Sequence, residues 1–177
     1  MYRRQLVEGY FFREDYTIGE DMLFLWEVSA QARKISCSDY RGYCYFYNPS
    51  GAMLKPFRAS DMDQIRCWQV VLESLQGSGG PVQTGNGQVQ ISDEEVTSRC
   101  ASILLISCML VVGKLAGLPR EERKQYRQLR RKCSEVLKET LKIHGAYEGL
   151  DRGYRLKVRL YRSAPELYLF LYHWIRR

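Results

Sequence analysis

The sequence predicts a mainly α fold with a small β element near residues 34–48. Two observations predict the helices. Apolar residues recur at helical spacing after Ser60, and residues 103–112 are apolar on every face. A third predicts the β element, because Tyr43, Tyr45 and Tyr47 would share one face of a strand over residues 40–47. With 177 residues and 45% hydrophobic side chains, the chain is long enough for one domain with a core.

The N-terminal third is predicted from short local patterns. Residues 1–8 can form a short helix, and residues 9–17 an extended segment that ends at Gly19. An amphipathic helix is expected over residues 20–33. Residues 34–38 are predicted to be a brief strand, and Asn48-Pro-Ser-Gly51 has the composition of a turn.

The acidic pair Glu20–Asp21 opens the predicted helix over residues 20–33. Steps of four, seven and eleven residues return to one side of a helix, so Asp21 is expected to lie above Leu25 and Val28 at a cleft edge. Glu20 is expected to face water. A helix N-terminus favours a carboxylate, and a carboxylate held at a cleft edge can act as a general base. The alternative is that the pair merely starts the helix.

The rest of the chain is predicted to be helical. Ser60 can cap a helix that carries acidic residues in its first turn. Residues 77–91 are predicted to be a mobile loop, because residues 77–90 hold five glycines, one proline and no charge. Ser92-Asp-Glu-Glu95 is a capping box, and we expect a central buried helix over residues 93–116. Its all-round apolar run of ten residues is shorter than the roughly 20 that a bilayer needs.

Three further helices are expected towards the C-terminus. The first covers residues 120–144, begins after Pro119 and is dominated by Arg and Lys. A break over residues 145–153 separates it from a short helix over residues 154–161. Ser163-Ala-Pro-Glu166 is a second capping box, and it predicts a last helix over residues 167–175.

Positive charge is concentrated at the C-terminal end. Residues 1–119 hold 11 basic and 13 acidic residues, a net charge of −2, whereas residues 120–177 hold 16 and 7, a net charge of +9. This asymmetry predicts an anionic partner such as a membrane surface, a nucleic acid or an acidic polymer. Nucleic acid is disfavoured, because the basic helix has almost no interleaved aromatic residues and the chain carries no known binding module.

No metal site is predicted in this chain. Asp61-Met62-Asp63 has the D-x-D form of a sugar-nucleotide metal site, but two acids at a helix start favour its dipole without a metal. His144 and His173 lack neighbours at ligand spacing. No two of the six cysteines are in CxxC spacing, so we predict reduced, mostly buried thiols in a cytosolic chain. The start of the chain lacks the apolar run of a signal peptide, and no glycine-rich phosphate loop is present.

The last helix carries aromatic residues next to arginines. Tyr168, Tyr172 and Trp174 lie among Leu and Ile, followed by Arg176 and Arg177. Such a helix suits a bilayer interface, so these five residues are predicted to form a membrane or partner surface. The alternative is a C-terminal helix that docks on the core.

Several pieces of the N-terminal third occur together in a distinctive order. They are YRRQLVE at 2–8, GYFFRED at 9–15, GED at 19–21 followed by MLFLWEV, KISCSDY at 34–40, YCYFYN at 43–48, and then Ser50 and Met53. As a set, segment 2–55 resembles the latter part of the catalytic domain of family-2 glycosyltransferases, the bacterial polysaccharide type with a GT-A α/β fold. The helical remainder is similar to the variable C-terminal region of such enzymes.

The resemblance implies a catalytic role for the acidic pair. Asp21, with Glu20 beside it, would deprotonate an acceptor hydroxyl as the hydroxyl attacks the anomeric carbon of a nucleotide-sugar, with inversion. Lys55 or Arg58 is expected from its charge to meet the diphosphate. The residues expected to line the acceptor side or to close over the donor phosphates are Tyr45, Tyr47, Asn48, Ser50 and Lys55.

The resemblance also implies a division of the chain. Residues 1–57 would be the C-terminal piece of a GT-A-like catalytic domain, and residues 58–177 a helical C-terminal region. In this family the nucleotide and a divalent cation, Mn²⁺ or Mg²⁺, bind to an N-terminal α/β half that carries the D-x-D motif. Because this chain does not contain that half, we expect no cofactor in it and no activity from it alone. It would be a truncated gene product, an excised fragment or one piece of a split enzyme.

The expected setting is the cytoplasm, with peripheral attachment to the inner face of a bacterial membrane. The expected partners are a nucleotide-sugar, a glycan acceptor, and either a separate N-terminal half or a second copy of the chain. The alternative is a non-catalytic helical adaptor that binds a membrane surface or a partner protein through residues 120–177.

Overall fold

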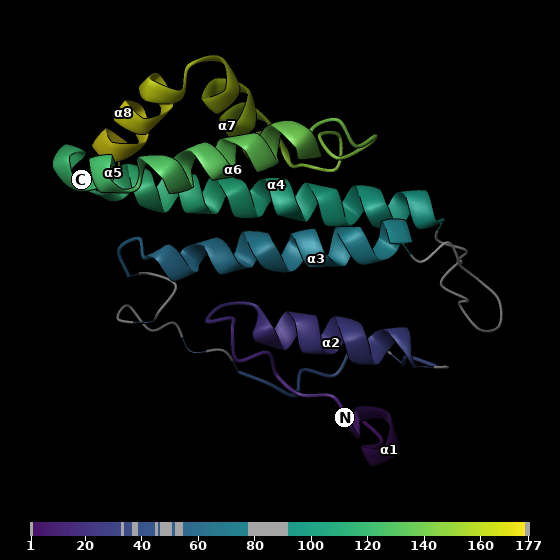
Figure 1. The fold of residues 1–177 in the computed structure, drawn as a ribbon. Coiled ribbons are helices and arrows are strands. Elements are labelled where there is room, and N and C mark those ends of the chain that lie inside the picture. Colours follow the sequence, from purple (N-terminus) through teal and green to yellow (C-terminus); the bar gives the residue numbers. More distant parts are fainter. Residues whose placement is uncertain are drawn as a thin grey trace.

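The computed structural model describes residues 2–32, 34–36, 39–44, 46, 51, 55–77 and 92–175. Within these ranges the protein is mainly helical, as the sequence predicts (Figure 1). The short 3₁₀ helix η2 leads directly into α3. In chain order the elements are α1 (Arg4–Val7), α2 (Glu20–Ala30), η2 (Ala59–Met62), α3 (Asp63–Gly77), α4 (Asp93–Gly117), α5 (Arg120–Gln125), α6 (Arg127–Thr140), α7 (Arg152–Ser163) and α8 (Pro165–Ile175).

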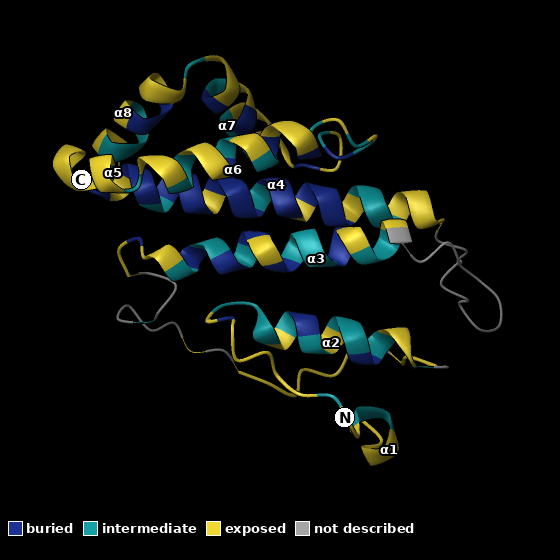
Figure 2. Ribbon diagram, in the orientation of Figure 1, coloured by how far each residue is buried: buried dark blue, intermediate teal, exposed yellow. Residues whose placement is uncertain are grey.

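Helix α4 lies at the centre of the fold. It contacts α3 on one side and α6, α7 and α8 on the other, while α2 packs on the outer side of α3 (Figure 1). Thirteen of its 25 residues are buried, and Figure 2 shows it as the most continuously buried helix. Ser92 Oγ accepts a hydrogen bond from the Glu95 N–H at 3.1 Å, so the predicted cap is present. The predicted central buried helix is therefore confirmed.

By length and composition, α4 is also the one helix in the described ranges that could cross a membrane. Residues 103–112 are part of a 25-residue helix. The apolar stretch is therefore longer than those ten residues. However, 72% of the apolar window is buried inside the fold. The core helix of a globular bundle has the same pattern.

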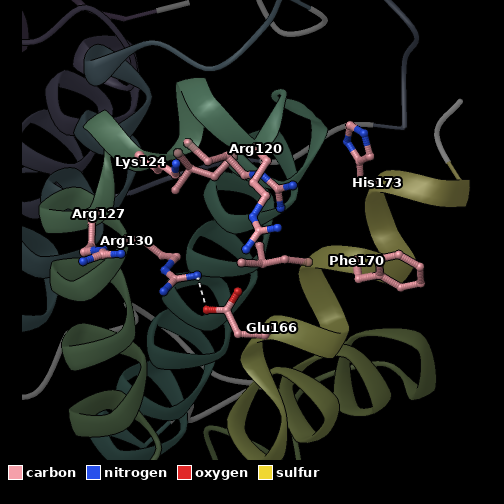
Figure 3. A pocket seen from close by; sticks show the side chains of 10 residues that line it. Arg120, Lys124, Arg127, Arg130, Glu166, Phe170 and His173 are labelled. Atoms are coloured by element: carbon pink, nitrogen blue, oxygen red, sulfur yellow. Dashed lines mark hydrogen bonds and ion pairs between the residues drawn. The ribbon is translucent and has the colours of Figure 1, made fainter.

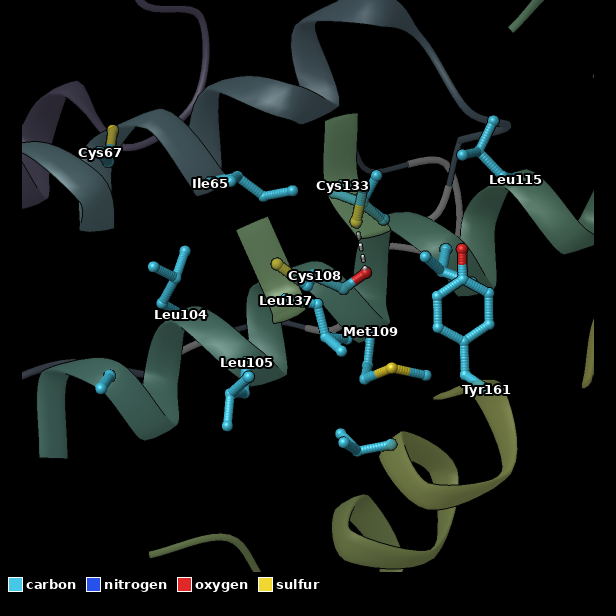
Figure 4. Packing of buried hydrophobic residues seen from close by; sticks show 14 of the residues in the cluster. Ile65, Cys67, Leu104, Leu105, Cys108, Met109, Leu115, Cys133, Leu137 and Tyr161 are labelled. Carbon is cyan, nitrogen blue, oxygen red and sulfur yellow. Dashed lines mark hydrogen bonds between the residues drawn. The ribbon is translucent and has the colours of Figure 1, made fainter. Parts of the chain in front are cut away.

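The core forms around the middle of α4. Leu104, Leu105 and Met109 are buried there, beside residues from α3, α6 and α7 (Figure 4). Cys133 on α6 donates its S–H to the Cys108 carbonyl at 3.4 Å. A hydrogen bond with Cys133 and burial both raise the pKa of the Cys108 thiol. The cysteines of the described residues form no disulfide, and all but Cys44 are buried, as predicted for most of them.

The basic helix expected over residues 120–144 is divided in the structure. It breaks at Tyr126, where α5 ends and α6 begins, and α6 ends at Thr140. The Tyr126 ring packs edge-on against Phe57 with ring centroids 4.9 Å apart. Phe57 lies just before η2 and is buried, so this contact draws residue 126 towards the core. A long-range contact of this kind leaves no trace in local helical spacing.

The predicted β element near residues 34–48 is not found where the structure describes this segment. Residues 34–36, 39–44 and 46 contain no strand. Ile35, Tyr43 and Phe46 are each largely exposed, so alternation along the chain is not matched by a buried face. A pair of short strands is marginal without a sheet or helix to cover it. Residues 37, 38, 45 and 47 lie outside the described residues, as does nearly all of the predicted mobile loop at 77–91.

The second predicted capping box also differs from the structure. Ser163 ends α7 instead of capping α8, since its Oγ lies 2.9 Å from the Arg159 carbonyl one turn earlier. Pro165 then begins α8 two residues earlier than expected. A proline suits the first turn of a helix because no intrahelical partner is lost there.

Candidate functional site

The Gly19-Glu20-Asp21 turn is held tightly against α3. Gly19 has φ of +91°, a left-handed conformation that glycine adopts without strain. A Cβ atom at residue 19 would lie 2.5 Å from Cys67 Sγ, so the close approach also requires glycine. Burial is the main cause that raises the pKa of Cys67 to about 11. The thiol is therefore protonated at neutral pH, and it donates to the Ile18 carbonyl at 3.4 Å.

Gly19→Ala is expected to lower the free energy of unfolding by about 2–4 kcal/mol, because the left-handed conformation and the overlap with Cys67 both add cost. Gly9 is a matched control. It has φ of +88°, but nothing lies within 4 Å of a Cβ atom there. Gly9→Ala should therefore show only the conformational cost of about 1–2 kcal/mol. Urea denaturation of the two variants checks this, and equal losses would contradict the contact with Cys67.

The orientation expected for the acidic pair is reversed in the structure. Asp21 is exposed, whereas Glu20 is partly buried. The predicted stripe below Asp21 fails at Leu25, which is 46% exposed, although Val28 is buried as expected. Helix α2 packs on α3 through Leu23 and Trp26, whose Nε1 donates to Ser74 Oγ at 3.0 Å. Because residues 22–26 are all apolar, their spacing did not fix which side of α2 would be buried.

Of the other predicted substrate-binding residues, the structure describes Lys55 alone. Lys55 is exposed in the segment before η2. The remaining four, Tyr45, Tyr47, Asn48 and Ser50, lie outside the described residues.

Both D-x-D carboxylates form ion pairs and accept backbone hydrogen bonds within the fold. Asp61 is buried, with Oδ1 2.6 Å from Lys114 Nζ on α4 and Oδ2 accepting the Arg58 N–H at 2.7 Å. Asp63 accepts the Thr17 N–H at 3.0 Å and pairs with Arg66. These contacts fix the N-terminal segment and α4 to the start of α3. No cluster of three metal-ligating side chains occurs among the described residues.

A basic pocket, which sequence reasoning missed, lies between α5, α6 and α8. Its volume is about 540 Å³. It is walled by cations from α5 and α6 and by one acidic, one aromatic and one imidazole side chain from α8 (Figure 3). The full lining is Leu115, Arg120, Arg123, Lys124, Arg127, Arg130, Glu166, Leu169, Phe170 and His173.

The charges in this basic pocket are unevenly satisfied. Arg130 pairs with Glu166 at 2.7 Å across the gap between α6 and α8 (Figure 3), and Lys124 pairs with Glu121 at 2.7 Å. The three other arginines form no ion pair with a carboxylate of the described residues; they are Arg120, Arg123 and Arg127. The Nε atom of Arg123 is buried and has no hydrogen-bond partner there. A buried donor without a partner is uncommon in folded proteins.

The sequence did contain a signal for this pocket. Arg120, Arg123, Arg127 and Arg130 follow one another at steps of three, four and three residues, the spacing of a single helix face. The spacing alone does not predict a pocket, because nothing local shows that α8 packs against the same face.

Of the residues predicted for the C-terminal surface, one belongs to the core and a second is partly buried against it. Tyr168 is buried and packs edge-on against Tyr161, with ring centroids 5.5 Å apart. Tyr172 stacks on Tyr168 and lies against Gly113, where a Cβ atom would meet its hydroxyl at 2.9 Å. Trp174 is 71% exposed, as that prediction requires. Arg176 and Arg177 lie outside the described residues.

No protein-family model, no curated protein and no solved structure matches this chain. The resemblance of residues 2–55 to family-2 glycosyltransferases therefore stays a prediction from the sequence.

Proposed function

We propose that this chain is the C-terminal, acceptor-side part of an inverting family-2 glycosyltransferase that builds bacterial cell-surface polysaccharide. The observation that carries the proposal is the Gly19-Glu20-Asp21 turn. Its glycine is held against Cys67, and Asp21 follows it on the open side of the first turn of α2. A carboxylate in this place is fixed by the backbone yet remains accessible to a substrate.

The proposed chemistry uses Asp21 as the general base. Its carboxylate accepts the proton of an acceptor hydroxyl while the hydroxyl oxygen attacks the anomeric carbon of a nucleotide-sugar. The bond from that carbon to the nucleoside diphosphate breaks, the diphosphate leaves with the bonding electrons, and the anomeric configuration inverts. A general base must reach the proton directly or through one water, which an exposed side chain allows. The residues proposed to line the acceptor side or to close over the donor phosphates are Tyr45, Tyr47, Asn48, Ser50 and Lys55.

A second polypeptide segment is required to hold the donor, because catalysis of this transfer depends on positioning both substrates. The N-terminal part of the chain offers a surface for it. Of the 15 large hydrophobic side chains that are exposed among the described residues, eight lie in residues 2–46. Phe12 stacks on Phe24 of α2 with ring centroids 4.7 Å apart, and Tyr2 contacts the same ring edge-on. Where exposed apolar groups form a contiguous patch, they mark a surface that contacts another protein part.

A second candidate function is a helical adaptor that binds a membrane surface through the C-terminal region. Leu167, Phe170 and Trp174 are exposed and recur at steps of three and four residues along α8. An apolar stripe beside a basic region suits an anionic bilayer interface. Binding to anionic vesicles that is lost in a Phe170→Ser, Trp174→Ser variant would favour this candidate.

The proposed division of labour is tested by nucleotide titration of the chain alone. Thermal unfolding is followed with UDP, GDP and their sugar conjugates, with and without Mn²⁺, and with pyrophosphate as the control for charge. A ligand that binds only the folded state must raise Tm. We expect no nucleotide to raise Tm more than pyrophosphate does, because contacts to base and ribose belong to the other segment. A rise specific to one nucleotide would contradict the proposal.

A further inference from the structure

We propose that the basic pocket between α5, α6 and α8 is a binding site for a phosphate group carried by an organic ligand. This pocket is separate from the proposed site of glycosyl transfer, since none of the pocket residues belongs to the Gly19-Glu20-Asp21 turn. It follows from the charge, the buried donor and the shape of the pocket.

The lining of the pocket carries a large excess of positive charge. Some arginines elsewhere have carboxylate partners, as in the Arg13–Glu27, Arg99–Glu95 and Arg131–Glu135 pairs. In the pocket, five cations face one carboxylate, that of Glu166. Glu166 is 78% exposed, and an exposed ion pair contributes little free energy. A bound dianion can therefore replace Glu166 as the ion-pair partner of Arg130 at a small cost in free energy.

Arg123 supplies the sharpest indication of a ligand. Its Nε is buried without a partner among the described residues, and it lies in a wall shared with Arg120 and Arg127. Leaving a buried donor unsatisfied is costly, and an oxygen acceptor would remove that cost. Guanidinium groups bind phosphate through paired, charge-assisted hydrogen bonds, so converging arginines suit a tetrahedral oxyanion.

The size and walls of the pocket indicate what else the ligand carries. A volume of about 540 Å³ falls within the range for small-molecule sites and exceeds what one phosphate group needs. Leu115, Leu169 and Phe170 add apolar surface beside the cations. His173 lines the same space, with Nδ1 3.0 Å from the Ala116 carbonyl, which orients the ring. A phosphate ester with an apolar or mixed organic group therefore fits better than a bare ion.

Binding is measured by isothermal titration of the full chain at constant ionic strength, with inorganic phosphate, pyrophosphate and glycerol 3-phosphate as separate probes. Vesicles of phosphatidylglycerol, compared with phosphatidylcholine, test whether a lipid headgroup supplies the phosphate. Arg123→Gln and Arg127→Gln should each weaken binding by about tenfold or more, as expected for a lost charge-assisted hydrogen bond. Glu166→Gln should strengthen it by about two- to fivefold by removing the competing carboxylate.

Arg131→Gln is the matched control. Arg131 is the next residue after Arg130 on α6, is 82% exposed, pairs with Glu135 and lies outside the pocket. Arg131→Gln removes one positive charge, as the pocket variants do. The affinity of this variant for each probe should therefore stay within about twofold of that of the wild-type chain if binding is local to the pocket. Circular dichroism verifies that each variant is folded.

The outcomes separate clearly. Weakening by both pocket variants but not by Arg131→Gln, with a soluble probe or with anionic vesicles, supports the site and identifies the source of the phosphate. Equal weakening by all three variants, or no binding in any arm, overturns it. None of these measurements involves sugar transfer, so failure of the phosphate site leaves the proposed transferase function unaffected, and the reverse also holds.

Discussion

Asp21→Asn is expected to lower the rate of sugar transfer by about 100- to 10,000-fold, the usual contribution of a general base. The amide keeps the size of the side chain and its place at the N-terminus of α2, but it cannot accept the proton of the acceptor hydroxyl. The measurement is the initial rate of transfer from a labelled nucleotide-sugar, with the donor-binding segment present. In the assay this segment is supplied as a separate polypeptide, the N-terminal α/β half of a family-2 glycosyltransferase.

Glu20→Gln is the matched control for Asp21→Asn. Both residues lie in the first turn of α2, so both variants remove one negative charge from the same helix terminus. Glu20 is partly buried, whereas Asp21 is exposed. We expect Glu20→Gln to lower the rate far less than Asp21→Asn does. A larger loss in Glu20→Gln would assign the base to Glu20 and contradict the orientation in the structure.

Lys114→Met is expected to lower the free energy of unfolding by about 3–5 kcal/mol, because it leaves the Asp61 carboxylate buried without its cation. The two side chains are 13% and 4% exposed, and Nζ lies 2.6 Å from Oδ1. For a chain of this size the change corresponds to a fall in Tm of roughly 6–20 °C. Chemical denaturation monitored by circular dichroism gives the free energy.

Two variants show whether burial of the charge causes this loss. Lys142→Met breaks an exposed pair with Glu139 and should lower the free energy of unfolding far less than Lys114→Met does, because water screens exposed charges. The double variant Asp61→Asn, Lys114→Met removes both charges while leaving an oxygen that can accept the Arg58 N–H. It should recover much of the stability lost in Lys114→Met, since a neutral pair lacks the desolvation cost of a lone charge. A double variant as unstable as the single one would show that packing is responsible.

The parts of the fold that local sequence determines were predictable. The cap at Ser92 and the long apolar stretch of α4 are both set by neighbours in the chain, and both are present. The start of α2 at Glu20 was likewise placed by the glycine and the acidic pair that precede its apolar residues.

The features that depend on distant contacts were not predictable from spacing. The basic helix breaks at Tyr126, whose ring packs against Phe57, and Tyr168 of α8 packs against Tyr161 of α7. The exposed segment over residues 39–44 alternates like a strand, yet it has no packed face in the structure.

Spacing along the chain also could not predict the geometry of the two candidate sites. The position of Asp21 in the chain was evident, but its direction was not, since α2 is apolar on more than one side and only packing on α3 decides which side is buried. The arginines of the basic pocket were visible as a regular series. Their convergence depends on α8, which places Glu166 and His173 opposite them from the far end of the sequence.

The central claim is that Asp21 belongs to an inverting sugar transferase whose donor site lies in a separate segment. The most direct test is the anomeric configuration of the product that this chain forms together with the separately supplied N-terminal half, determined by NMR from an α-linked nucleotide-sugar. The account predicts transfer only when both parts are present, with a β-linked product. An α-linked product, or transfer by this chain alone, would contradict it.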